Sequence, residues 1–205
     1  LPEQYSFIFN DLENNKKALN YLYSRGLDKQ KIIRWKIGYC SSGVYADRIV
    51  VPSFDCSGKL NYFVTRTISN HPVRYKNPKS SKDIIFNDLM INWKEPITLV
   101  EGVFDSFNVE NSIPLLGSTL NEHSGLLHKI VKHQSSVYIA LDRDAFEKSL
   151  SIYKILSKYN IKTKIILLKD DRDFGDMTPS EVLDLYKEAS DINSSNYLMY
   201  EIMKI

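Results

Sequence analysis

Acidic residues follow three apolar segments in the second half of this 205-residue chain. Glu101 comes directly after the segment 97–100, and Asp142 and Asp144 follow the segment 137–141. A third segment, 164–168, is followed by Asp170, Asp171, Asp173 and Asp176. Loops are polar, so one acid after a strand carries little information. Three such groups, with a glycine after the first and an Asp-x-Asp pair after the second, favour a functional site.

Carboxylates that are brought together repel one another unless a cation neutralises them. Hard oxygen ligands of this kind favour Mg²⁺, which proteins usually bind through one or two carboxylates together with substrate phosphates. Such a metal orients and screens the phosphates while an attacking hydroxyl is activated. The pattern therefore predicts a magnesium-dependent site for phosphoryl or nucleotidyl transfer, with Mn²⁺ able to substitute.

The segments that must position these acids alternate between strand-like and helix-like patterns. That order favours a mostly parallel sheet with right-handed crossovers. In such a sheet ligands bind beyond the carboxyl ends of the strands, which is where the acids fall. The expected strands are 97–100, 113–116, 137–141 and 164–168, and the expected helices are 103–110, 122–133, 145–158 and 179–188.

The first half of the chain has the pattern of a small α+β subdomain. Helical spacing over 14–25 ends at Gly26, and Asp28 is placed to cap a second short helix. The segments 49–54 and 60–67 have strand character and are joined by a turn. The predicted organisation is an N-terminal subdomain (1–94), a parallel-sheet subdomain (95–190) and a C-terminal helix (191–205).

The balance of basic and acidic residues also changes at the boundary between residues 94 and 95. Residues 1–94 carry 15 Lys and Arg against 8 Asp and Glu, whereas residues 95–205 carry 12 against 17. A basic first half could face phosphates, and aromatic residues near its basic positions could stack on bases. The alternative is that the cations are solvated and the aromatics belong to the core. The residues concerned are Arg48, Arg66, Arg74, Lys76, Tyr62, Phe63 and Tyr75.

Several of these segments resemble a known family. Residues 99–105, Leu-Val-Glu-Gly-Val-Phe-Asp, resemble the "VEGYMD" element of primase Toprim domains, and residues 140–145 resemble the "DxDxAG" element. Residues 116–119 resemble the Gly-Thr/Ser turn that follows the first element. Phe146 stands where primases usually have glycine, which would crowd the start of the next helix. The resemblance implies a Toprim fold, an α/β Rossmann-like parallel sheet with flanking helices.

Elements upstream of the Toprim segment resemble DnaG-type primases in particular. They include the "A..YL..RG" helix, the "xRixfPI" strand and the "KYLNSP" loop, and they occur in the family's order. The matching segments are 18–27, 37–39, 47–52, 58–60, 65–66 and 74–78. The chain therefore resembles the RNA polymerase domain, the catalytic core, of a DnaG-type primase, and its departures from the usual motifs look phage-like.

The resemblance also implies roles for individual residues. Glu101, Asp142 and Asp144 would be the principal metal ligands and, with Asp105, the catalytic residues. Asp173 would contribute at the margin of the site together with Asp176, and the choice among these two, Asp170 and Asp171 stays open. Template and nucleotide phosphates would be bound by Arg48, Arg66, Arg74, Lys76 and Asn77.

The activity implied by the resemblance is the joining of nucleoside triphosphates into short RNA primers on a single-stranded DNA template. It would depend on Mg²⁺ and take place in the cytoplasm of a bacterium or a phage-infected cell. A replicative helicase and a zinc-binding module are implied partners, and neither has a counterpart in this sequence. No apolar run approaches the roughly 20 residues that a membrane-spanning helix needs, so no membrane partner is expected.

Three alternatives remain at this stage. Another Toprim activity, a nuclease or a topoisomerase fragment, uses the same acids, although a topoisomerase needs a further tyrosine-bearing domain. A receiver-like signalling domain also gathers acids at strand ends, but Glu101 and the Asp-x-Asp pair do not fit its plan. A non-catalytic module that binds single-stranded nucleic acid would lack metal dependence.

Overall fold

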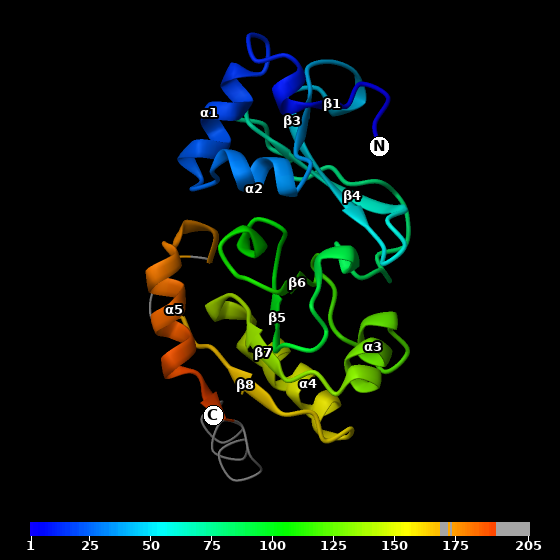
Figure 1. The fold of residues 1–205 in the computed structure, drawn as a ribbon, viewed down its shortest axis with the longest axis vertical. Helices are drawn as coiled ribbons and strands as arrows, with labels where there is room; N and C mark the ends of the chain where they lie inside the picture. Colours follow the sequence, from blue (N-terminus) through cyan, green and yellow to red (C-terminus); the bar gives the residue numbers. More distant parts are fainter. Residues whose placement is uncertain (169–171, 173, 192–205) are drawn as a thin grey trace. The chain divides into compact units, whose positions relative to one another are not determined.

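The computed structural model describes residues 1–168, 172 and 174–191, which fall into two compact units (Figure 1). The first unit is Leu1–Met90, and the second begins at Ile91. Each unit has its own sheet and its own buried apolar core.

The first unit is built on a four-stranded antiparallel sheet with the strand order β1-β2-β3-β4. Its longest pairing joins β3 to β4, with Arg48 opposite Thr67 and Ile49 opposite Arg66. The turn between them is fixed by Asp55, whose carboxylate accepts hydrogen bonds from the backbone of Ser57 and Lys59. The strands are β1 (Ser6–Phe7), β2 (Gly38–Cys40), β3 (Arg48–Phe54) and β4 (Leu60–Thr67).

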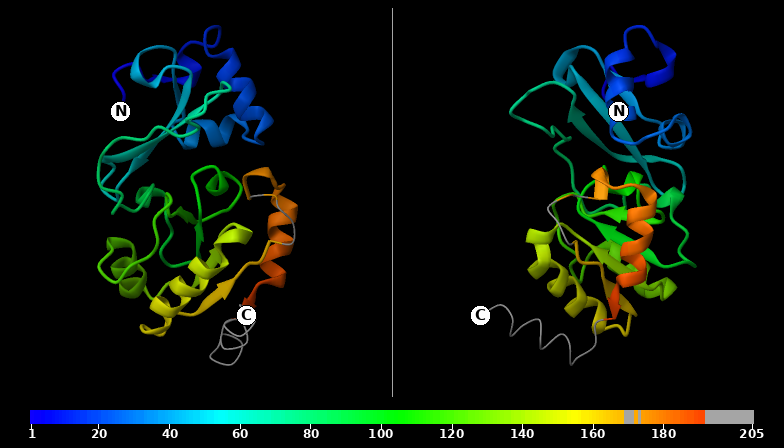
Figure 2. Two further views of the ribbon diagram at one scale, coloured as in Figure 1. Left: turned by 180° about the vertical axis from the view of Figure 1, so that it is seen from behind. Right: turned by 90° about the vertical axis from the view of Figure 1, so that its left-hand side faces the viewer.

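Two helices lie on one side of this sheet (Figures 1 and 2). Asp28 caps the second helix as predicted, because its side chain accepts a hydrogen bond from the Lys31 backbone N–H at 2.7 Å. Leu22 of the first helix and Ile32 of the second are fully buried. The helical segments are η1 (Ile8–Asn10), α1 (Lys16–Ser24), α2 (Lys29–Arg34), η2 (Gly43–Tyr45) and η3 (Asp88–Met90).

The second unit contains the predicted parallel sheet. Four of its strands are parallel and the fifth, β9, runs antiparallel at the edge beside β8. The strand order is β6-β5-β7-β8-β9, so β5, β7 and β8 lie side by side. The strands are β5 (Ile97–Val100), β6 (Ser112–Pro114), β7 (Val137–Ala140), β8 (Thr163–Ile165) and β9 (Ser190–Asp191).

Helices cover this sheet, and α4 and α5 lie on opposite sides of it in the right-hand view of Figure 2. Tyr186 of α5 packs against Tyr138 with ring centroids 4.8 Å apart and shares a hydrogen bond with Thr98. Helix α5 begins with a complete capping box formed by Thr178 and Glu181. The helical segments are η4 (Asp105–Phe107), α3 (Gly125–His133), η5 (Arg143–Ala145), α4 (Phe146–Ser157), η6 (Phe174–Asp176) and α5 (Pro179–Glu188).

Several features differ from the expectations. The strand expected over 164–168 ends at Ile165, and the helix expected over 122–133 begins at Gly125. The helix predicted over 103–110 is reduced to the single turn η4, and Asn111 adopts a positive φ of 46°, which a continuing helix cannot contain. Strands β1, β2 and β9 were not predicted, since two or three residues are too few to show a period. Of the expected terminal helix 191–205, only Asp191 is described, and it lies in β9. The rest of that prediction falls outside the described residues.

Among the residues that the structure describes, no helix combines the length and apolar character needed to cross a membrane.

Candidate metal centre and basic surface

The first two acid-bearing strands are neighbours in the sheet. Val100, the last residue of β5, pairs with Ala140, the last residue of β7. Glu101 therefore follows directly at the carboxyl edge, and Asp142 follows one residue later on the adjacent strand. Strand β8 pairs with β7 on its other side. The sheet order brings the ends of β5, β7 and β8 to one edge, but β8 ends at Ile165, and Asp170, Asp171 and Asp173 lie outside the described residues.

Glu101 has two carboxylate oxygens in different surroundings. Oε1 forms an ion pair with the ammonium of Lys148 at 2.9 Å. Oε2 is buried and has no hydrogen-bond partner among the described residues. A buried acceptor without a donor costs about 1–3 kcal/mol, more when it is charged. A cation at this oxygen would remove that cost.

Asp105 supports the turn that carries Glu101. It is 8% exposed, and its Oδ2 accepts a hydrogen bond from the Gly102 backbone N–H at 2.8 Å. The Glu101 backbone carbonyl in turn accepts from the Leu116 N–H at 3.1 Å. These two bonds fix the backbone on both sides of the Glu101 side chain, so Asp105 positions Glu101 in this structure.

Asp142 and Asp144 lie at the start of the next helix. The Asp142 carbonyl accepts from the Ala145 N–H at 2.9 Å and so begins the turn η5. Asp142 is half-buried and Asp144 is exposed. Phe146 is half-buried and lines a cavity of about 340 Å³ together with Asp142 and the segment 165–168. The crowding expected from Phe146 is therefore relieved by this space beside the helix start.

The last acidic group is described only in part. Asp176 is exposed in the turn η6, whereas Asp170, Asp171 and Asp173 lie outside the described residues. Asn108 anchors this turn, because its Nδ2 lies 3.1–3.3 Å from the carbonyl oxygens of Phe174, Gly175 and Met177. Sequence reasoning missed Asn108. A single asparagine in a segment expected to be helical gave no signal that it would reach residues more than sixty positions away.

The acids agree in chemical type with a divalent cation, but they do not form a compact cluster in the described conformation. Among residues 1–168, 172 and 174–191, no group of three or more His, Cys, Asp or Glu lies close enough together to hold a metal ion. Glu101 instead pairs with Lys148. The buried Oε2 of Glu101 and the neighbouring Asp142 are hard oxygen donors of the kind that Mg²⁺ uses.

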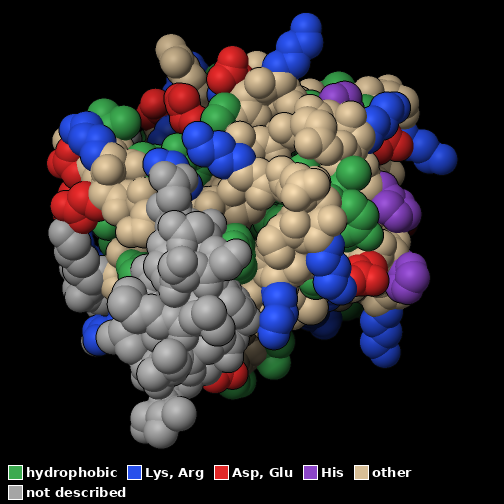
Figure 3. Space-filling view, turned by 90° about the horizontal axis from the view of Figure 1, so that it is seen from below, with side chains coloured by type: hydrophobic (Ala, Val, Ile, Leu, Met, Phe, Trp, Pro, Cys, Tyr) green, Lys and Arg blue, Asp and Glu red, His purple; other side chains and the backbone are tan. Residues whose placement is uncertain are grey.

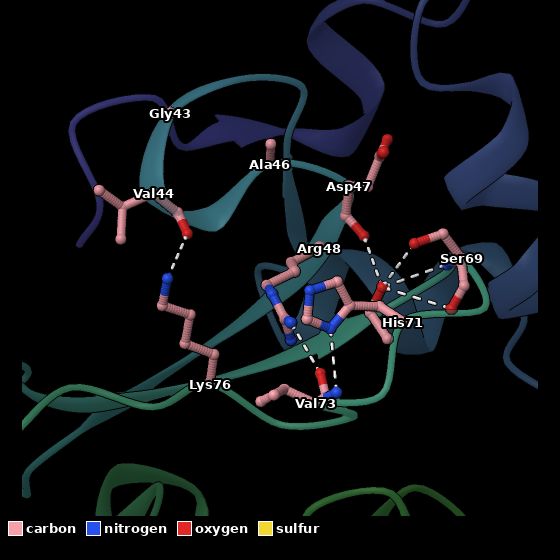
Figure 4. A pocket seen from close by; sticks show the side chains of 10 residues that line it. Gly43, Val44, Ala46, Asp47, Arg48, Ser69, His71, Val73 and Lys76 are labelled. Carbon is pink, nitrogen blue, oxygen red and sulfur yellow. Dashed lines mark hydrogen bonds between the residues drawn. The ribbon is translucent and has the colours of Figure 1, made fainter.

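In the first unit, Arg48 is a structural cation. It is 3% exposed, and its guanidinium donates to the carbonyl oxygens of Val73 at 2.7 Å and Arg74 at 3.1 Å. Figure 4 shows the bond to Val73. Burial lowers the pKa of this guanidinium from its ordinary value. Arg48 therefore holds the segment 73–74 against strand β3.

The two cations of that segment are exposed. Arg74 and Lys76 both have exposed side chains, and the Lys76 ammonium donates to the Val44 carbonyl at 3.0 Å (Figure 4). Asn77 is half-buried, and its side-chain oxygen accepts from the Thr65 backbone N–H at 3.0 Å. Asn77 thus fastens the segment to β4 while Arg74 and Lys76 face solvent.

The aromatic residues near these cations separate into core and surface. Tyr62 is 3% exposed, as the core alternative expected, whereas Tyr75 is 40% exposed. Arg66 donates to the Tyr75 hydroxyl at 2.6 Å, and its guanidinium lies 5.3 Å from the Tyr75 ring centroid. Phe63 packs edge-to-face on Tyr45 at 5.5 Å. Tyr75 is therefore the member of the predicted aromatic set that presents its ring to solvent beside cations.

A cavity of about 420 Å³ lies between these segments (Figure 4). It is lined by 43–44, 46–48 and parts of 67–76, with Lys76 and His71 on its walls. The Val73 backbone N–H donates to His71 Nδ1 at 3.0 Å. The cavity is thus bounded by the same loop that Arg48 anchors.

The surface does not carry charge of a single sign throughout. On the face in Figure 3, acidic and basic side chains are interspersed, with apolar side chains between them. The candidate site is consequently defined by the individual contacts described above.

The arrangement of these elements matches solved structures of one class. The chain has the fold of the DnaG primase catalytic core: it aligns with the structure of a DnaG primase catalytic domain bound to single-stranded DNA at a TM-score of 0.77. That alignment covers 95% of this chain and 78% of the other at 16% identity. The fold class predicted from the sequence is confirmed.

Two further comparisons name particular proteins. The zinc-binding and RNA polymerase domains of the Aquifex aeolicus primase align at a TM-score of 0.74 and 19% identity, over 88% of this chain and 58% of that one. A DNA primase of Clostridium acetobutylicum is 23% identical over 82% of this chain. The chain spans about a third of that relative's length, 36%. No family model matches the chain. The resemblance to DnaG-type primases is thereby confirmed.

Proposed function

We propose that this chain is the RNA-polymerising core of a DnaG-type DNA primase, which synthesises short RNA primers on single-stranded DNA. The observation that carries the proposal is the placement of Glu101 and Asp142 at the carboxyl ends of adjacent parallel strands, in a fold shared with primase cores. The buried Oε2 of Glu101 supports it, since this oxygen has no hydrogen-bond partner among the described residues and a cation beside it would stabilise it.

Glu101, Asp142 and Asp144 would hold Mg²⁺, with Asp173 and Asp176 at the margin of the site. When bound, Mg²⁺ or Mn²⁺ supplies charge screening of the triphosphate and activation of the growing 3′-hydroxyl. Asp105 keeps the turn of Glu101 fixed through its bond to Gly102. Asn108 keeps the turn of Asp176 fixed by donating from its Nδ2 to backbone carbonyls of that turn.

The exposed cations of the first unit would bind the phosphates of template or nucleotide. Arg74 and Lys76 face solvent, and Arg66 is paired with an exposed aromatic ring on which a base could stack. Arg48 and Asn77 would serve the same surface by holding its loop in place. This division of labour follows from burial, because a guanidinium that is 3% exposed and bonded to two carbonyls presents little of itself to a phosphate.

The proposal extends to partners that the resemblance implies. Nucleoside triphosphates and single-stranded DNA would be the substrates, and the reaction would take place in the cytoplasm. A zinc-binding module and a replicative helicase would act with this core during initiation. The core by itself should therefore initiate poorly and extend a supplied primer better.

The test is primer extension on single-stranded DNA with nucleoside triphosphates and Mg²⁺ or Mn²⁺. Glu101→Gln and Asp142→Asn should abolish incorporation while the protein stays folded, because each removes a charged ligand and little volume. Asp184→Asn, which changes an exposed acid on α5, is the matched control and should extend normally. Incorporation at the wild-type rate by both site variants would place the chemistry elsewhere.

The same samples separate the proposal from its rivals. Metal-dependent cleavage of labelled DNA without incorporation would favour a Toprim nuclease. Binding of single-stranded DNA without either reaction would favour a non-catalytic module. Replacing a cation that contacts the template, Arg74 or Lys76, by alanine should reduce the salt dependence of single-strand binding by a log–log slope of roughly 0.7.

A further inference from the structure

The ion pair between Lys148 and Glu101 joins a helix to a strand end of the candidate site. Lys148 lies in the first turn of α4, and its Nζ is 2.9 Å from Oε1 of Glu101, 47 residues earlier in the chain. The two side chains are only 21% and 31% exposed. The Lys187–Asp184 pair on α5 is far more open, at 66% and 63%. Lys148 is therefore a partly buried cation placed against a candidate metal ligand.

The second carboxylate oxygen of Glu101, Oε2, differs from Oε1 in its surroundings. Oε2 is buried and has no hydrogen-bond partner among the described residues, while Oε1 receives the ammonium. An ammonium is a compact point charge on a flexible four-carbon stem. Lys148 thus neutralises the carboxylate from one side and can move away from it by rotating about the bonds of its stem.

We propose that Lys148 is a built-in counter-ion of Glu101, which neutralises this carboxylate in the metal-free protein and competes with the divalent cation for it. The inference rests on the proposed function, because it takes Glu101 as a metal ligand. Binding of the cation exchanges the ammonium for the metal at Glu101. Lys148 therefore lowers the affinity of the site for metal and stabilises the metal-free unit by neutralising the Glu101 carboxylate.

Direct binding of Mn²⁺ to the full chain tests the competition without relying on activity. Titration followed by electron paramagnetic resonance gives the Kd for wild type and for variants. Lys148→Met removes the charge and keeps much of the stem, so its Kd should fall roughly five-fold, as expected for loss of a competing partly exposed ion pair. Lys148→Gln should act in the same direction if the methionine variant folds poorly.

Two controls separate charge competition from general electrostatics. Lys148→Arg keeps the positive charge and should leave the Kd near the wild-type value. Lys187→Met removes a lysine from an exposed pair of the same unit and should also leave it unchanged. In EDTA, Lys148→Met should unfold at a lower temperature than wild type, and saturating Mn²⁺ should remove that difference.

The outcomes distinguish this inference from the proposed function. If Glu101→Gln weakens Mn²⁺ binding but Lys148→Met and Lys148→Gln bind it no more tightly than wild type, the metal site stands and the competition is wrong. If Glu101→Gln binds Mn²⁺ as wild type does, Glu101 is no ligand, and both the metal site and the inference fail.

Discussion

Replacing Arg48 with methionine should destabilise the first unit strongly, although arginine is usually a surface residue. Its guanidinium makes two charge-assisted hydrogen bonds, to the carbonyls of Val73 and Arg74, at 2.7 and 3.1 Å. Hydrogen bonds to charged groups contribute about 1.5–3 kcal/mol each. Because residues 73 and 74 are exposed, their carbonyls regain water when Arg48 is lost, so the lower value applies. The expected loss is about 3 kcal/mol in the free energy of unfolding.

Fluorescence can measure this loss in the first unit alone. The chain has two tryptophans, and Trp35 stacks on Phe86 in the first unit whereas Trp93 lies in the second. In a Trp93→Phe background, urea unfolding followed by the emission of Trp35 reports the first unit. Methionine retains an apolar stem of similar length, so the change isolates the hydrogen bonds from the packing.

A matched control is available on the same unit. Arg34 is an exposed arginine at the end of α2, and Arg34→Met should change the free energy of unfolding by less than about 0.5 kcal/mol. If Arg48→Met also stays within about 0.5 kcal/mol of wild type, then its two bonds do not anchor the loop and the reasoning fails. Protease cleavage near residues 69–76 should become faster in Arg48→Met and stay unchanged in Arg34→Met.

Three further predictions concern the second unit. Asn108→Ala removes the amide that donates to carbonyls at 174, 175 and 177, and should cost about 1–2 kcal/mol of unfolding free energy and speed amide exchange in that turn. Thr178→Ala removes the cap of α5 and should cost about 1 kcal/mol by urea unfolding, whereas Thr178→Ser should cost little. Burial raises the pKa of Tyr186 to about 12, so the stability it contributes is complete below the unfolded value near 10 and is lost as pH rises from there towards 12. Tyr186→Phe should therefore flatten the fall in unfolding temperature over that range, and an unchanged pH profile would contradict the assignment.

The sequence determined the elements that depend on local signals. Asp28 caps α2 and Thr178 caps α5, because a short polar side chain satisfies the free N–H groups of the next turn wherever the helix is placed. Strands β4 and β5 have the bounds that were expected, since both segments are rich in β-branched, aromatic and aliphatic residues. The helix predicted over 103–110 was wrong, since only the single turn η4 (Asp105–Phe107) forms there.

The sequence also placed the acids, because a carboxylate that directly follows a buried strand must lie at the carboxyl edge of the sheet. The motif resemblance rested on the same positions, and the comparisons confirmed it at the level of the fold. The order β6-β5-β7-β8 was not readable from the chain, since consecutive strands need not be neighbours. Only the sheet revealed that β5 and β7 bring Glu101 and Asp142 to adjacent positions.

Only the tertiary structure showed which polar side chains hold or pair with groups that are distant in the sequence. Arg48 looked like an exposed cation, but a loop 25 to 26 residues later folds over it and accepts both of its hydrogen bonds. Lys148 reaches Glu101 across 47 residues, and Asn108 reaches Met177 across 69. The physical reason is the same for all three residues. Their partners are brought close only when the chain folds, and the residues that flank a side chain in the sequence do not indicate a hydrogen bond to a partner so far along the chain.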